Sequence, residues 1–135
     1  MSHTAEIRVK LENINIEALK EAVKAAFRAV LNQDIEVREG GYVTDYYGRK
    51  TKCDLVIPFV GPGKARNIGF KIEEGELKMI YEDMMLRSDV ANRLLNTIRD
   101  AYITYMTASA LKSMGYNIKI DYENDTFQII AEKVM

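Results

Sequence analysis

The chain has 135 residues, a formal net charge of −1 and a charged fraction of 29%. This balance does not favour a protein that binds nucleic acid or membranes through a general positive field. No apolar segment approaches the ~20 residues that span a bilayer, and the single cysteine, Cys53, permits neither an internal disulfide nor a cysteine metal cluster. We therefore expect a cytoplasmic protein with no metal and no cofactor.

The first part of the chain predicts a strand followed by an amphipathic helix. From Glu6 to Glu12 apolar and charged residues alternate strictly, which is typical of a half-buried strand. Asn15 is a suitable N-cap for a helix that runs from Ile16 to about Leu31. The apolar residues of this helix recur at helical spacing and form one stripe, made of Leu19, Val23, Ala26, Phe27 and Val30.

The middle of the chain predicts two hairpins. Ile35–Tyr46 and Lys50–Val60 have the composition of strands around a short turn. Pro58 cannot donate to a strand ladder, so it marks a sheet edge or a bulge. The segments Ile68–Ile72 and Leu77–Tyr81 alternate in the same way and form the second hairpin.

A long helix is predicted from Asp89 to Met114, with Ser88 as its N-cap and Gly115 as its stop. Such a helix is roughly 40 Å long, which is more than one sheet face usually needs. Its second half, Ala101–Leu111, has apolar or small residues on nearly every side. A helix without a polar face is expected to be buried on more than one side.

A last hairpin, Ile118–Tyr122 and Phe127–Ala131, completes the element order β-α-β-β-β-β-α-β-β. Short connections between neighbouring strands favour antiparallel pairing. Strands with one polar face favour a sheet that is covered on one side. We therefore expect one α+β domain over residues 1–135, with a mostly antiparallel sheet and two helices on one face.

Short segments along nearly the whole chain resemble one family, the small uncharacterised proteins encoded as conserved open reading frames in cyanobacterial and plastid genomes. The resemblance implies a compact α+β domain and no established function, and it supplies no active residues. The segments that carry it are Met1–His3, Asn15–Lys20, Tyr47–Arg49, Lys52–Ile57, Asn67–Phe70, Leu77–Ile80, Ala101–Tyr102 and Gly115–Tyr116.

Aromatic and cationic residues interleave on the first predicted hairpin. Such a mixture can stack bases and neutralise phosphates, and it also suits a protein-binding surface, where Tyr and Arg are favoured anchors. A third interpretation is a tyrosine-rich hairpin that packs on its own domain. The near-neutral chain favours a protein partner over nucleic acid. The candidate binding residues are Tyr42, Tyr46, Tyr47, Arg49, Lys50 and Lys52.

The second half of the long helix is a candidate dimer interface. Two helices and one sheet offer little material to cover this half within one copy of the chain, which favours a homodimer. The alternative is that both sides of the helix are covered within the monomer. The candidate interface residues are Tyr102, Tyr105, Met106 and Ser109.

The loop that begins with Gly61-Pro62-Gly63 is a candidate anion site through Lys64 and Arg66. A phosphate-binding loop needs a following helix whose N-terminus holds the anion, and here a strand follows. The simpler interpretation is therefore a hairpin loop with two solvated cations.

Two single residues could carry chemistry. His3 is the only histidine, so it has no second imidazole with which to form a ligand set. Cys53 has no His–Asn partner that would activate its thiol, and it starts an apolar strand, where a thiol behaves as a small apolar group. We expect structural roles for both residues.

These patterns favour a non-catalytic binding or assembly domain that self-associates and binds a protein through the hairpin of residues 42–52. The alternative is a small-ligand-binding protein or enzyme with a pocket between the sheet and the long helix. In that case Tyr102, Thr104 and Tyr105 would orient the ligand.

Overall fold

The computed structural model describes residues 4–61 and 64–134. Two helices and seven strands occur in these residues, in the predicted order and with predominantly antiparallel pairing, which confirms the α+β class. The elements are β1 (Thr4–Lys10), α1 (Ile16–Leu31), β2 (Arg38–Thr44), β3 (Lys50–Gly61), β4 (Lys64–Glu73), β5 (Glu76–Glu82), α2 (Ser88–Ser113), β6 (Tyr116–Glu123) and β7 (Thr126–Lys133).

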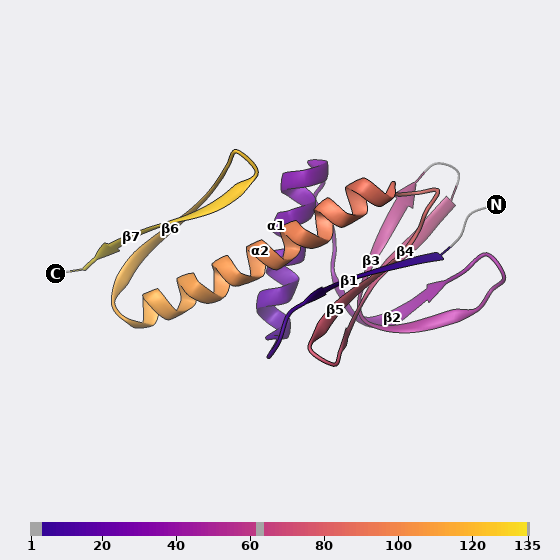
Figure 1. Ribbon diagram of the computed structural model, residues 1–135, viewed down its shortest axis with the longest axis horizontal. Helices are drawn as coiled ribbons and strands as arrows, with labels where there is room; N and C mark the ends of the chain where they lie inside the picture. Colours follow the sequence, from indigo (N-terminus) through magenta and orange to yellow (C-terminus); the bar gives the residue numbers. More distant parts are fainter. Residues whose placement is uncertain (1–3, 62–63, 135) are drawn as a thin grey trace.

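The strands divide into two sheets. Five of them form an antiparallel sheet in the order β1-β5-β4-β3-β2, while β6 and β7 form a separate two-stranded sheet. Strand β1 does not pair with β2, the next strand in the sequence. It pairs with β5 instead, with Ile7 opposite Met79. Figure 1 shows the last hairpin lying beside the far half of α2, away from the larger sheet.

One face of the five-stranded sheet carries the main core, and both helices pack on it. Leu55, Phe70 and Met79 from neighbouring strands form one cluster with Phe27 of α1 and Leu94 of α2. These side chains are completely buried. The predicted placement of both helices on one face is therefore confirmed, and in Figure 1 the two helices cross each other.

Local signals in the sequence explain the helix boundaries well at α1 and less well at α2. The Asn15 side chain accepts the backbone N–H of Ala18 at 3.0 Å, as expected of an N-cap. By contrast, Ser88 is the first residue of α2, and the cap position falls on Arg87, whose side chain makes no capping hydrogen bond. The prediction of Ser88 as the cap was wrong by one residue.

Strand β3 changes its facing at Asp54. Leu55 faces the helices, whereas Cys53 lies on the opposite face, although regular alternation would put both on one side. The Oδ2 atom of Asp54 accepts the backbone N–H of Ile72 at 2.7 Å, in place of a strand carbonyl. The ladder between β3 and β4 accordingly begins at Leu55, and the earlier part of β3 pairs only with β2.

The outer part of the β2–β3 hairpin folds over the sheet face that the helices leave open. It lies against Gly69 of β4, where a Cβ would overlap the Cys53 Sγ and the Val43 Cγ2. The Asn67 Nδ2 donates to the Tyr42 carbonyl oxygen at 2.9 Å and ties β2 to β4. These contacts fix the hairpin on the fold. The small apolar cluster beneath it consists of Val43, Cys53, Val56 and Ile80.

No helix in the described part of the chain combines the length and the apolar character needed to cross a membrane.

Candidate functional site

The turn of the β2–β3 hairpin is built around Asp45. Its Oδ1 atom accepts the backbone N–H groups of Tyr47 and Arg49 at 2.9 and 2.8 Å, and its Oδ2 accepts the Arg49 Nε at 2.9 Å. Gly48 supplies the positive φ of 81° that the turn requires. Desolvation opposes ionisation of Asp45, but the hydrogen bonds and the charge of Arg49, together with the Tyr47 N–H, outweigh it and lower the pKa of the carboxyl group. The turn is therefore held by an ionised side chain.

The structure brings the six predicted binding residues together on this hairpin. The rings of Tyr42, Tyr46 and Tyr47 are all at least half exposed. The Arg49 guanidinium lies 5.5 Å from the centre of the Tyr47 ring, and the Lys50 ammonium lies 5.8 Å from the centre of the Tyr42 ring. Cations are thus held against aromatic rings that remain open to solvent.

The outward face of this hairpin carries unneutralised positive charge. Lys52 lies opposite Tyr42, and Lys50 lies opposite Thr44, so neither lysine has an acidic partner across the strands. Among the described residues, no carboxylate forms an ion pair with Lys50 or Lys52, whereas Arg49 is paired with Asp45. We call the set Tyr42, Tyr46, Tyr47, Arg49, Lys50 and Lys52 the tyrosine–cation surface.

Residues 103–134 form an arm that has almost no core of its own. Of these residues, all of which the structure describes, only Ala108 is buried. The arm consists of the last turns of α2 and the β6–β7 hairpin, and a two-stranded hairpin is at best marginally stable by itself. We call residues 103–134 the C-terminal arm.

An apolar stripe runs along the exposed side of α2 in the C-terminal arm and ends at Met114, the residue that follows the helix. Ile103, Met106 and Met114 are 52%, 39% and 68% exposed, and the small Ala110 lies exposed between them. Their spacing of three, four and four residues places them on one side of a helix. Ala101, which belongs to the main core, and Ala108, which lines a cavity beside the last hairpin, lie on other sides of the helix. We call Ile103, Met106, Ala110 and Met114 the outer stripe.

The predicted dimer residues do not share one surface. Tyr102 is only 5% exposed, and its hydroxyl accepts the backbone N–H of Asn15 at 2.8 Å, so it belongs to the core of the single chain. Tyr105 is partly buried against that core. Met106 and Ser109 are exposed. The prediction failed for Tyr102 because periodicity alone does not show which side of an apolar helix faces α1.

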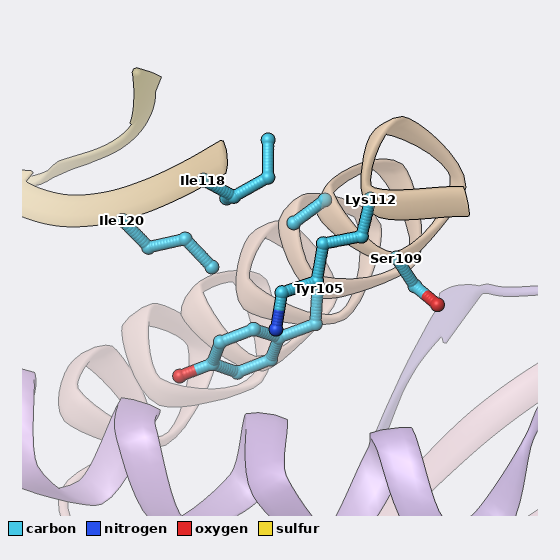
Figure 2. Close-up of a pocket in the computed structure, with 6 residues that line it drawn as sticks. Tyr105, Ser109, Lys112, Ile118 and Ile120 are labelled. Atoms are coloured by element: carbon cyan, nitrogen blue, oxygen red, sulfur yellow. The ribbon is translucent and has the colours of Figure 1, made fainter. Parts of the chain in front are cut away.

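Two neighbouring cavities lie between α2 and the last hairpin. One of about 350 Å³ is lined by Ser109, Lys112 and Ile118, and one of about 300 Å³ by Phe127 and residues of α1. Tyr105 and Ile120 line both. Figure 2 shows Ile118 and Ile120 of β6 directed toward α2 above the Tyr105 ring. The hairpin therefore rests loosely on the helix.

The polar groups of the alternative ligand site do not converge on one cavity. Tyr105 lines the two cavities just described, and Thr104 lines a different one of about 240 Å³. The Thr104 hydroxyl donates to the Asp100 carbonyl oxygen at 2.7 Å, and the Tyr102 hydroxyl bonds to the start of α1. These three cavities lie beside the last hairpin rather than between α2 and the five-stranded sheet.

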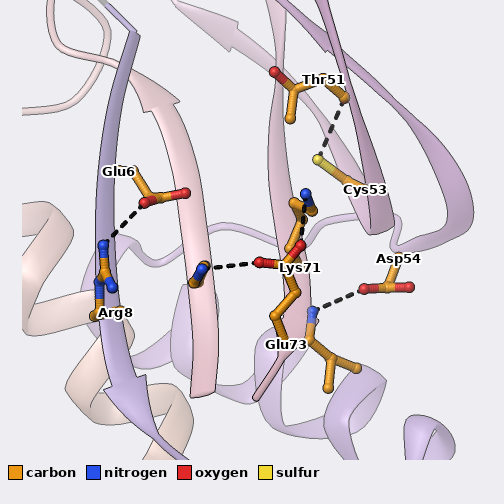
Figure 3. A network of polar contacts seen from close by, with 9 residues as sticks. Glu6, Arg8, Thr51, Cys53, Asp54, Lys71 and Glu73 are labelled. Carbon is orange, nitrogen blue, oxygen red and sulfur yellow. Dashed lines mark hydrogen bonds and ion pairs between the residues drawn. The ribbon is translucent and has the colours of Figure 1, made fainter. Parts of the chain in front are cut away.

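Cys53 is buried and its thiol is not activated. Burial raises the pKa of Cys53 above its ordinary value, and the nearby Lys71 ammonium offsets this only in part. The Sγ atom donates to the Thr51 carbonyl oxygen at 3.6 Å, as Figure 3 shows. The expected role of a small apolar group fits this position. The side chains of Lys64 and Arg66, and all of His3, lie outside the described residues.

Charged side chains form a network beside this cluster, on the sheet face opposite the helices. Glu73 accepts bonds from Lys71 and Lys78, each at 2.8 Å, and Figure 3 shows Lys71 and Glu73 together with the pair of Arg8 and Glu6. The two hydrogen bonds lower the pKa of Glu73 to about 2. The arrangement is one of mutual neutralisation. Within residues 4–61 and 64–134, no three His, Cys, Asp or Glu side chains gather in a way that could hold a metal ion.

Sequence reasoning missed one buried carboxyl group, Glu82. It is almost fully buried at the end of β5; its Oε1 accepts the Thr4 hydroxyl at 3.4 Å, and no described residue donates to its Oε2. The alternating pattern of β5 marks Ile80 and Glu82 as members of one face, but it does not show that this face is covered.

Comparison with known proteins found no match: no protein-family model, no curated protein and no solved structure is similar to this chain. The resemblance to the conserved cyanobacterial and plastid reading frames therefore stays a prediction.

Proposed function

We propose that this protein is a non-catalytic assembly domain that forms a homodimer through the outer stripe of α2. The proposal rests on one observation, the row of exposed apolar residues on a helix that extends past its own sheet. Exposed apolar side chains that recur at helical spacing are a feature of helix-mediated interfaces. The lone, buried thiol of Cys53 fits a reducing, cytoplasmic setting, which belongs to the same proposal.

A second copy of the chain is the occupant that suits this surface. The segment Ala101–Leu111 contains no charged residue, so two copies can meet there without burying an unpaired charge. Ala110 lies in the middle of the outer stripe, where its small side chain lets two helices approach closely. A two-fold axis would then place Met106 of each copy near Ala110 or Met114 of the other.

Replacing Met106 with Glu tests the interface. A carboxylate in the middle of the stripe would have to be buried without a partner, so the variant is expected to be monomeric in size-exclusion chromatography. Asn92→Glu is the matched control, because it adds the same charge to an exposed position of α2 outside the C-terminal arm. The interface is wrong if both variants keep the wild-type elution volume, or if both change it equally.

The tyrosine–cation surface supports a second interaction, with a protein partner. Its residues are exposed, while the turn that presents them is fixed by Asp45, so little conformational freedom is lost on binding. The double variant Arg49→Glu/Lys50→Glu is expected to lose any partner that the wild-type protein captures from a lysate. The matched control is Arg87→Glu/Lys133→Glu, which reverses the same number of charges at two exposed positions outside the hairpin; Arg87, like Arg49, is paired with a nearby aspartate, Asp89. Equal capture by the wild type and the double variant would remove this surface from the proposal.

A further inference from the structure

We infer that the tyrosine–cation surface binds an extended acidic segment of a protein, with carboxylates at alternate residues. This inference deepens the second interaction proposed above and rests on it. The chain as a whole has a net charge of −1, yet the hairpin between Tyr42 and Lys52 carries three cations and one acid, Asp45. The surface is therefore locally positive on a weakly negative protein, and it selects partners by charge.

The geometry of the two lysines suits an extended chain. Lys50 and Lys52 project from the same side of β3, two residues apart, which corresponds to roughly 6.5 Å along a strand. Side chains at alternate positions of an extended peptide have the same separation. One carboxylate can therefore meet each ammonium group without distortion of either chain. Arg49 adds nothing to this pairing, because Asp45 already neutralises it.

The tyrosines favour peptide over single-stranded RNA. Base stacking needs an open aromatic face. Here Lys50 lies over the Tyr42 ring and Arg49 over the Tyr47 ring, while Tyr46 and Tyr47 meet edge to face at a centroid distance of 5.4 Å. Two of the three rings thus already have a cation against them, and amphipathic tyrosine rings suit the backbone and the apolar side chains of a peptide.

Titration with labelled probes tests the inference. The probes are a short synthetic peptide that alternates Glu with Val, its Lys–Val counterpart, and a single-stranded RNA of oligouridine. Binding of the Glu–Val peptide alone, measured by fluorescence anisotropy and weakened by added salt, is the expected result. No binding of that peptide, or tighter binding of the RNA, would overturn the inference.

Charge reversal at Lys52 tests whether the peptide binds at this surface or is attracted to the protein by nonspecific electrostatics. Lys52→Glu is expected to weaken binding of the Glu–Val peptide at least about tenfold, because the substitution removes one ion pair and adds a repulsion. Lys133→Glu is the matched control, since Lys133 is also exposed and lies opposite a tyrosine, Tyr116, on the neighbouring strand. Equal weakening in both variants would contradict a specific site. Lys52→Gln removes the positive charge without adding a negative one. Its affinity for the peptide is therefore expected to lie between those of the wild type and Lys52→Glu.

The two experiments distinguish a failure of the acidic-peptide inference from a failure of the proposed interaction with a protein. If the acidic peptide does not bind while Arg49→Glu/Lys50→Glu still abolishes capture of a protein from lysate, the hairpin binds a partner of other chemistry and only the inference is wrong. If the double variant captures the same proteins as wild type and the peptide does not bind, the interaction itself is wrong.

Discussion

The Tyr102 hydroxyl accepts the backbone N–H of Asn15 at 2.8 Å and joins the middle of α2 to the residue that caps α1. The same hydroxyl donates to the Asn13 carbonyl oxygen at 3.4 Å. One side chain thus satisfies two backbone groups in the connection before α1, where the chain adopts a positive φ at Asn13. Tyr102 therefore holds the two helices in register rather than forming part of an outer surface.

Removing this hydroxyl is expected to destabilise the fold. Tyr102→Phe leaves the Asn15 N–H without its partner in a partly buried place, which costs about 1–2 kcal/mol. The free energy of unfolding is measured by urea denaturation. Tyr122→Phe serves as the control, because the Tyr122 hydroxyl makes only a long, exposed contact of 3.5 Å with Asp125. Equal stability of Tyr102→Phe and wild type would contradict a structural role for the bond.

A side chain at position 69 is expected to destabilise the fold, because the Cys53 sulfur occupies the space that a Cβ would need. In Gly69→Ala the new methyl group would overlap the Cys53 Sγ and the Val43 Cγ2, at an expected cost of about 1–3 kcal/mol in unfolding free energy. Adding Cys53→Ala removes one of the two clashes, so the double variant is expected to recover part of the loss. Purely additive losses in denaturant unfolding would show that the hairpin does not press on Gly69.

The pair of lysines around Glu73 gives a pH dependence of stability. The pKa of Glu73 falls from 4.5 to about 2 in the folded protein, so its contribution is complete above about pH 4.5 and is lost as the pH falls toward 2. Glu73→Gln is expected to be less stable than wild type at neutral pH, and this difference should shrink as the pH approaches 2. Urea unfolding across this range measures it. A difference that does not change with pH would contradict the lowered pKa.

The Cys53 thiol is expected to resist modification in the folded protein. It is buried, and its raised pKa reduces the thiolate that reacts. A chromogenic disulfide reagent should label it slowly under native conditions and rapidly in denaturant. Rapid labelling of the native protein would mean that the β2–β3 hairpin lifts from Gly69.

Local and periodic signals predicted the secondary structure, because short-range rules decide it. The Asn15 cap, the alternating strands and the stripe of α1 all occur as expected. Long-range arrangements could not be read in the same way. Regular alternation would put Cys53 and Leu55 on one face of β3, but the Ile72 N–H bonds to the Asp54 side chain and the two residues lie on opposite faces, which no short-range pattern shows.

The sequence predicted the residues of the tyrosine–cation surface better than the exposed residues of the long helix. The tyrosine–cation surface is contiguous in sequence, so one hairpin brings its residues together. The residues of the long helix offered several apolar sides at once, and the choice among them depends on where α1 packs. The bond between Tyr102 and Asn15 turns one side of α2 toward α1 and leaves the outer stripe on another side.

The most direct test of the central claim is the mass of the wild-type protein in solution. Sedimentation equilibrium at micromolar concentrations measures it without reference to shape. Self-association through the outer stripe predicts twice the 15.4 kDa mass of one chain, with a return to the single-chain mass in Met106→Glu. A wild-type protein that stays at 15.4 kDa over that concentration range would contradict the account.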